Sequence, residues 1–207
     1  MTSLQSSWKR CWNALEASGN GLALMQDLIT AYEEPQRKYH TIQHLTECVA
    51  LLEQNLDLAA EQGEVEIALW FHDAVYNVRA SDNEARSAEW AAAALEKASV
   101  APDRIERVKQ HIMATRHSAK PTGQDQMLVV DIDLSILGAP EPRFAEYEAQ
   151  VRAEYRWVPE FLFRSKRKSI LAEFGARDSI YNTPRLREQL EARARENLAY
   201  SLKQLGS

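Results

Sequence analysis

The amino-acid sequence predicts an all-α protein, and three observations support this fold class. Only seven glycines and seven prolines occur among the 207 residues, so residues that break helices are rare. Alanine, leucine, glutamate, arginine and glutamine, which favour helices, are abundant. Apolar residues make up 45% of the chain and recur at steps of three and four, as on a buried helical face. We therefore expect one globular domain of packed helices with few strands.

Two helices are expected in the first half of the chain. In 41–56 the apolar positions form one stripe of helical spacing, and His44 lies near the start of this helix. The next segment, 64–74 (EVEIALWFHDA), is nearly all apolar after its first turn. It predicts a central, buried helix whose last turn contains His72 and Asp73.

The following segments also have the start signals of helices. Ser81 and Glu84 have the S-x-x-E spacing of a capping box, which opens an alanine-rich helix as far as about residue 98. Asp82 alone is a second candidate for this cap. A further helix is expected over 102–115, because proline suits the first helical position.

The segment 127–138 (MLVVDIDLSILG) is the one place where strand and helix compete, because its β-branched residues favour a strand and its spacing suits a buried helix. We predict a helix. From Pro142 onwards the chain is expected to be helical, with breaks near Pro159, Gly175 and Pro184.

Charge and cysteine content exclude several classes of protein. The net charge of -5 would repel a nucleic-acid polymer. No apolar stretch of about 18 residues and no secretory signal pattern occurs, so we expect a soluble, cytoplasmic protein without a membrane partner. Cys11 and Cys48 lie far apart without a CxxC motif, which predicts neither a disulfide framework nor a cysteine zinc site.

The candidate functional residues are histidines and aspartates. The five histidines are His40, His44, His72, His111 and His117. Burying His72 and Asp73 on an apolar helix costs several kcal/mol unless each finds a strong partner, and a divalent cation is such a partner. His44 could face this pair from a neighbouring helix. Asp131 and Asp133, acidic residues inside an apolar run, are both candidates for a fourth ligand.

The order of these residues resembles the HD superfamily of metal-dependent phosphohydrolases, whose signature is H, then HD, then D on successive helices. The matching residues are His44 in YHTIQHL, His72 and Asp73 in WFHDAVYN, and Asp133 in VVDIDLSILG. The segments RKYHTIQH, DNEARSA and YEAQVRAEY resemble a bacterial, single-domain subgroup of this superfamily. Because the superfamily usually uses the second acid of a D-x-D, the resemblance favours Asp133 over Asp131 as the ligand.

The resemblance implies an HD-domain-like helical bundle over 1–207. Within it, a metal-site core is expected at about 36–140 and C-terminal helices at about 141–204. The implied activity is hydrolysis of a phosphate ester or anhydride of a small molecule, with a nucleotide as the expected substrate. The attacking group would be a hydroxide bound to one or two divalent ions, which are Mn, Mg, Fe, Ni or Co.

Further residues are expected to have roles beyond metal binding. Asp73 and His117 are the expected catalytic residues, while His40, His111 and Arg152 are expected to contact the substrate. His111 and His117 are also candidate ligands of a second metal ion. Six residues apart on a helix, these two side chains would point about 240° from each other. Both can therefore reach one site only if the helix ends near residue 115.

Other functions remain open at this stage. The residues after the HD pair, AVYN, lack the acidic pair of guanosine-tetraphosphate hydrolases, the HDIGK-like run of HD-GYP phosphodiesterases and the HDIGH-type run of dNTP triphosphohydrolases. A non-catalytic metal- and nucleotide-binding sensor with the same fold is the main alternative. A helical interaction protein with structural histidines is a third. The substrate, the metal and the oligomeric state are not determined by the sequence.

Overall fold

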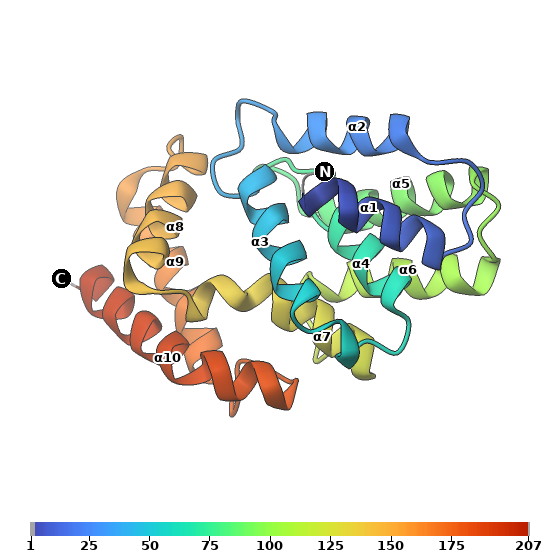
Figure 1. Ribbon diagram of the computed structural model, residues 1–207. Coiled ribbons are helices and arrows are strands. Elements are labelled where there is room, and N and C mark those ends of the chain that lie inside the picture. The colour runs from blue at the N-terminus through green and yellow to red at the C-terminus, as the bar shows by residue number, and fades with distance from the viewer. Residues whose placement is uncertain (1–2, 207) are drawn as a thin grey trace. The chain divides into compact units, whose positions relative to one another are not determined.

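The computed structural model describes residues 3–206, and every regular element in this range is a helix, so the predicted all-α class is confirmed (Figure 1). The backbone contacts divide the chain into two compact units, Met1–Asp133 and Leu134–Ser207. None of the described helices combines the length and the apolarity that crossing a membrane requires. The single-domain organisation stays a prediction.

The first unit is built around one buried helix. Its elements are α1 (Ser3–Ala14), α2 (Leu22–Tyr32), α3 (Ile42–Glu53), η1 (Leu56–Leu58), α4 (Gln62–Phe71), α5 (Asn83–Lys97), α6 (Pro102–Ala114) and α7 (Gln124–Asp133). Helix α4 packs against α1, α3, α5, α6 and α7, and its residues from Gly63 to Phe71 are all buried. This confirms the central helix predicted over 64–74.

Two buried glutamates of α4 are paired with arginines from the neighbouring helices. Glu66 accepts hydrogen bonds from Arg10 of α1, with Nε 3.0 Å from Oε2. Glu64 accepts two from Arg107 of α6, at 2.7 and 2.8 Å. Such forked pairs satisfy carboxylates that would otherwise be buried without a partner, and they fix α4 between α1 and α6.

Helix α4 ends earlier than predicted. Its last residue is Phe71, His72 is the C-cap, and Asp73 lies beyond the helix rather than in its last turn. The buried Arg37 donates hydrogen bonds to the backbone carbonyls of Asp73 at 2.6 Å and Ala74 at 2.9 Å. These carbonyls are therefore held by a side chain instead of by a continuing helix.

The capping box predicted at Ser81 and Glu84 is wrong. Helix α5 begins at Asn83, and its N-cap residue Asp82 makes no capping hydrogen bond with its side chain. The Asn83 side chain instead accepts from the backbone N–H of Asn77 and donates to the carbonyl of the same residue, both at 3.0 Å. This pairing closes the loop before α5, and the N-cap falls at Asp82, one residue later than the capping box predicts and at the second candidate position.

The chain from 102 to 138 follows the sequence prediction closely. Helix α6 begins at Pro102 and ends at Ala114, and the backbone of His117 is left-handed, with φ of 54°. The segment in which strand and helix compete forms the end of α7 and the 3-10 helix η2 (Leu134–Gly138). It is helical, as predicted.

The second unit consists of η2 and three helices, α8 (Glu141–Glu154), α9 (Glu160–Gly175) and α10 (Pro184–Gly206). The helix breaks predicted near Pro159, Gly175 and Pro184 are confirmed. Helix α10 packs against α9 and η2. Gly138 is required where η2 contacts α10, because a Cβ atom at this residue would lie 2.8 Å from the Cβ atom and the carbonyl oxygen of Leu190.

Candidate metal centre

Two buried histidines face each other inside the first unit. His44 lies on α3 and His72 caps α4, and their Nε2 atoms are 3.1 Å apart. Asp73 Oδ2 lies 3.0 Å from Nε2 of His72, and Asp133 Oδ1 lies 3.2 Å from Nε2 of His44. The structure thus brings together the four residues that the sequence proposed as ligands. We call them the four-ligand cluster.

The spacing of the four-ligand cluster fits a divalent ion. One ligand atom from each residue lies within 4.8 Å of the others. The remaining distances from the histidine nitrogens to the carboxylate oxygens are 3.5 and 3.6 Å. Ligands about 2.1 Å from one ion are about 3.0 Å apart at octahedral angles and about 3.4 Å apart at tetrahedral angles. The donor set and its spacing therefore match a single coordination sphere.

Hydrogen bonds behind the two rings set the orientation of their Nε2 atoms. The Nδ1 atom of His72 lies 2.8 Å from the carbonyl oxygen of Leu69. A carbonyl only accepts, so Nδ1 carries the proton and Nε2 of the neutral ring presents its lone pair to the cluster. Nδ1 of His44 lies 3.1 Å from the hydroxyl of Tyr39, which can hold this ring in the same way.

The charges of the cluster are strongly coupled. Burial alone would raise the pKa of Asp73, but His72 and then His40 hold it well below its ordinary value of 3.8. Burial would likewise raise the pKa of Asp133, but hydrogen bonds from His117 and His44 lower it well below 3.8. Burial would lower the pKa of His72, yet the two carboxylates raise it well above 6.5. A proton on this imidazole and a cation in the cluster therefore compete.

The four-ligand cluster is closed on its histidine side and open on its carboxylate side. The side chains of His44 and His72 are 3% and 1% exposed, whereas those of Asp73 and Asp133 are 16% and 14% exposed. Solvent and a small ligand can therefore approach past the carboxylates. An open side is what distinguishes a catalytic metal site from a purely structural one.

His117 lies next to the cluster, and His111 does not join it. His117 Nε2 is 3.0 Å from Asp133 Oδ2, and its side chain is 20% exposed. Helix α6 ends at Ala114 and the backbone is left-handed at His117, so the His117 side chain does not point where a continuing helix would direct it. It can therefore face the cluster. His111 is buried on α6, and within residues 3–206 neither of its ring nitrogens has a hydrogen-bond partner. Burial lowers its pKa.

The remaining candidates lie in three different settings. His40 stacks on the ring of Tyr76 at 4.1 Å, and its charge contributes to the low pKa of Asp73. Asp131 is fully buried and is not a member of the four-ligand cluster. Arg152 belongs to the second unit, where it donates to Glu160 and to two backbone carbonyls. Its contact with a substrate stays a prediction.

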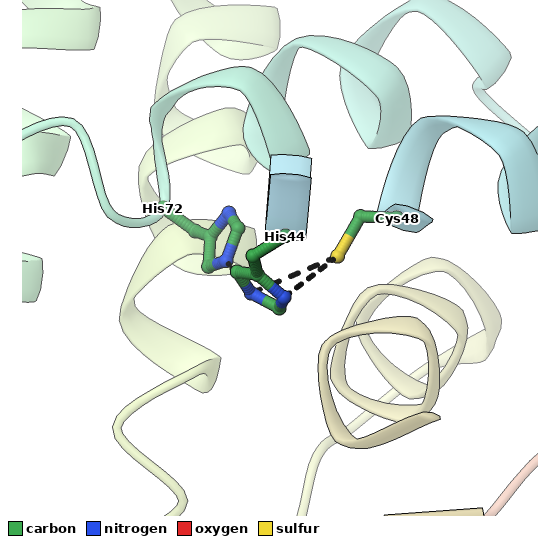
Figure 2. A group of neighbouring side chains, drawn as sticks. All are labelled: His44, Cys48 and His72. Atoms are coloured by element: carbon green, nitrogen blue, oxygen red, sulfur yellow. Dashed lines mark hydrogen bonds between the residues drawn. The ribbon is translucent and has the colours of Figure 1, made fainter. Parts of the chain in front are cut away.

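Sequence reasoning missed three residues that contact the cluster. Arg37 holds the backbone after the HD pair, Tyr39 holds the ring of His44, and Cys48 places its thiol 3.7 Å from both ring nitrogens of His44 (Figure 2). Cys48 follows His44 by four residues on α3, and that spacing, which puts two side chains on one helix face, was a usable signal. No spacing rule indicated Arg37 or Tyr39.

The fold and the site define an all-helical protein with a candidate metal centre of two histidines and two aspartates. No family model matches the chain, and neither a curated protein nor a solved structure matches it. Membership of the HD superfamily therefore stays a prediction from the sequence motifs.

Proposed function

We propose that the protein is a metal-dependent phosphohydrolase that acts on a phosphate ester or anhydride of a small molecule, a nucleotide being the expected substrate. The observation that carries this proposal is the convergence of His44, His72, Asp73 and Asp133 within 4.8 Å of one another. Their order along the chain, H, then HD, then D, is that of the HD phosphohydrolases. The open carboxylate side supports a catalytic rather than a structural centre.

The four-ligand cluster suits a particular group of metal ions. Two imidazole nitrogens and two carboxylate oxygens are preferred by Mn, Fe, Ni, Co or, less strongly, Mg. A divalent ion held there would lower the pKa of a bound water towards about 7 and polarise a phosphoryl oxygen. With two carboxylates and one divalent ion the buried charge is neutral, which keeps the site from carrying an uncompensated charge.

The side chains around the cluster supply the other functions of a hydrolase. Asp73, whose side chain is part-exposed, is the proposed acceptor of a proton from the attacking water. His117 is the proposed donor to the leaving oxygen, and the proton it would pass on is the one on Nε2 that faces Asp133 Oδ2. His40, held against Tyr76, offers a second imidazole for contact with phosphate oxygens. We keep His111 and Arg152 as candidates for substrate contact.

The proposal is tested by metal analysis combined with a screen of phosphorylated compounds. Purified protein is expected to contain a divalent metal and to release phosphate or pyrophosphate from a member of a nucleotide panel with added Mn²⁺. Asp73→Asn should remove both properties. The matched control is Asp103→Asn, since the side chain of Asp103 is 69% exposed on α6 and should not affect either.

Two outcomes would redirect the assignment. Metal-dependent binding of a nucleotide without turnover would favour the non-catalytic sensor. Protein that purifies without metal, and whose thermal stability does not change when Mn²⁺ or a chelator is added, would contradict both and leave a helical interaction protein.

A further inference from the structure

Cys48 lies against the metal centre but is not needed for the proposed hydrolysis. Its Sγ atom is 3.7 Å from Nε2 of His44, the same atom that faces His72 and Asp133. Figure 2 shows the three side chains in a row, with His44 between His72 and Cys48. All three are buried, and their ligand atoms lie within 4.8 Å of one another.

The thiol lies within reach of an ion bound by the two histidines. With a metal–nitrogen distance of about 2.1 Å and a metal–sulfur distance of about 2.3 Å, tetrahedral ligands place nitrogen and sulfur about 3.6 Å apart. Cys48 Sγ lies 3.7 Å from Nε2 of His44, close to this value, but it also lies 3.7 Å from Nδ1, so the Cys48 side chain must turn about its Cα–Cβ bond to reach an ion bound at Nε2.

We propose that His44 and His72 serve two overlapping metal sites, one completed by Asp73 and Asp133 and a second in which Cys48 binds a thiophilic divalent ion such as Zn²⁺ or Cd²⁺. This inference rests on the metal-binding part of the proposed function. When the sulfur–metal bond forms, the S–H bond breaks and its proton passes to solvent. No electron is transferred.

The charge of the ligands decides which of the two sites an ion occupies. A divalent ion with two carboxylates is neutral, and adding a thiolate would leave a net negative charge in a buried place. A soft ion is therefore expected to bind the two histidines and Cys48, which form one group of ligand atoms within 4.8 Å that includes neither aspartate. Three protein donors leave the fourth tetrahedral position to water or to one of the part-exposed carboxylates. Hard ions, which bind thiolates poorly, keep the carboxylate site with its open side.

The test uses Co²⁺, which accepts both carboxylate and thiolate ligands, as a spectroscopic probe, because bound cobalt shows a thiolate-to-metal charge-transfer band in the near ultraviolet only when sulfur is a ligand. Wild-type protein is titrated with Co²⁺ beside Cys48→Ser and Cys11→Ser. Cys11 is the matched control, since it is the other buried, free cysteine. It lies on α1, where its thiol donates a hydrogen bond to the carbonyl oxygen of Trp8. The band is expected in wild type and Cys11→Ser and should be absent in Cys48→Ser.

Affinities provide a second readout. Cys48→Ser should bind Zn²⁺ at least about tenfold more weakly than wild type. Its affinity for Mn²⁺ should be unchanged, which also shows that the variant is folded. Cys11→Ser should match wild type for both ions.

The failures of the two proposals are distinguishable. If cobalt shows its visible d–d bands in wild type but no charge-transfer band, an ion binds without Cys48 and only this inference is overturned. A charge-transfer band that persists in Cys48→Ser, or equal Zn²⁺ affinity in that variant and wild type, overturns it too. If wild type binds neither Co²⁺ nor Mn²⁺, the proposed function itself fails and the inference falls with it.

Discussion

The carboxylate of Asp133 joins His117 to the metal centre, since its Oδ2 atom lies 3.0 Å from His117 Nε2 while its Oδ1 atom lies 3.2 Å from Nε2 of His44. One side chain therefore faces both the proposed ion and the proposed proton donor. His117 can therefore act in two ways. It can donate its own proton in the reaction, and it can change the binding of the ion through its hydrogen bond to Asp133.

Replacing His117 should separate these two effects. His117→Asn is the informative change, because asparagine tolerates the left-handed backbone of this position better than most residues do. Loss of the proton donor should reduce kcat at least about 100-fold. The affinity for Mn²⁺, measured by calorimetry, should fall no more than about tenfold. Unchanged kcat would remove His117 from the catalytic residues.

The two acids of the D-x-D segment should differ sharply in metal binding. Asp133→Asn weakens a ligand of the four-ligand cluster and should reduce Mn²⁺ affinity at least about 100-fold. Asp131→Asn, at a buried position outside the cluster, should leave this affinity unchanged although it can lower stability. Titration of both variants by calorimetry or electron paramagnetic resonance decides between them. Equal losses of affinity would contradict the assignment of Asp133.

Tyr39 is expected to act on the metal only through His44. Tyr39→Phe removes the hydroxyl 3.1 Å from Nδ1 of His44 and should weaken Mn²⁺ binding about tenfold. Tyr181→Phe is the matched control, because its buried hydroxyl donates to the carbonyl of Leu134 in the second unit. That variant should lose about 1 kcal/mol of stability at constant Mn²⁺ affinity. If both variants bind Mn²⁺ equally well, Tyr39 has no orienting role.

Arg37 should contribute mainly to stability. Its guanidinium donates to the carbonyls of His40, Asp73 and Ala74 and is almost completely buried. Arg37→Met leaves these carbonyls without their donor and should lower the free energy of unfolding by about 3 kcal/mol. Arg104→Met, at a more exposed arginine bonded to one carbonyl, should cost less than about 1 kcal/mol. Urea denaturation of both variants provides the comparison.

The cluster predicts how the stability of chelator-treated protein depends on pH. The raised pKa of His72 gives a contribution that is complete below its ordinary value of 6.5 and is lost as the pH rises through the folded-state value. The lowered pKa of Asp73 gives a contribution that is present above 3.8 and is lost as the pH falls towards its folded-state value. Unfolding free energies should therefore peak between about pH 4 and 6.5. In His72→Gln the decline on the alkaline side should be smaller.

Much of the first unit could be predicted because its signals are local. The apolar run before the HD pair indicated the buried helix α4, and the proline at 102 with the end near residue 115 indicated α6. The competition in 127–138 was resolved correctly because the spacing of its apolar residues suits a helix buried on most sides. These features depend on neighbours within a few residues along the chain.

The features that were missed depend on contacts across the fold. Arg37 donates to carbonyls that are 36 and 37 residues away along the chain. The spacing of apolar residues in the sequence does not predict such hydrogen bonds. The capping box at Ser81 failed for a local reason, since the reciprocal bonds between Asn77 and Asn83, six residues apart, hold the chain before α5 in another conformation. The ligand positions of the cluster were proposed from motif order, whereas its second layer of hydrogen bonds required coordinates.

The backbone of His117 is left-handed, a conformation that glycine adopts without strain. A residue with a Cβ atom is destabilised there by about 1 kcal/mol or more. A glycine at 117 would relax the backbone and remove the imidazole beside Asp133. We therefore expect His117 to lower the folding stability of the protein while serving its chemistry. Selection for thermal stability alone should favour glycine at position 117, with loss of turnover.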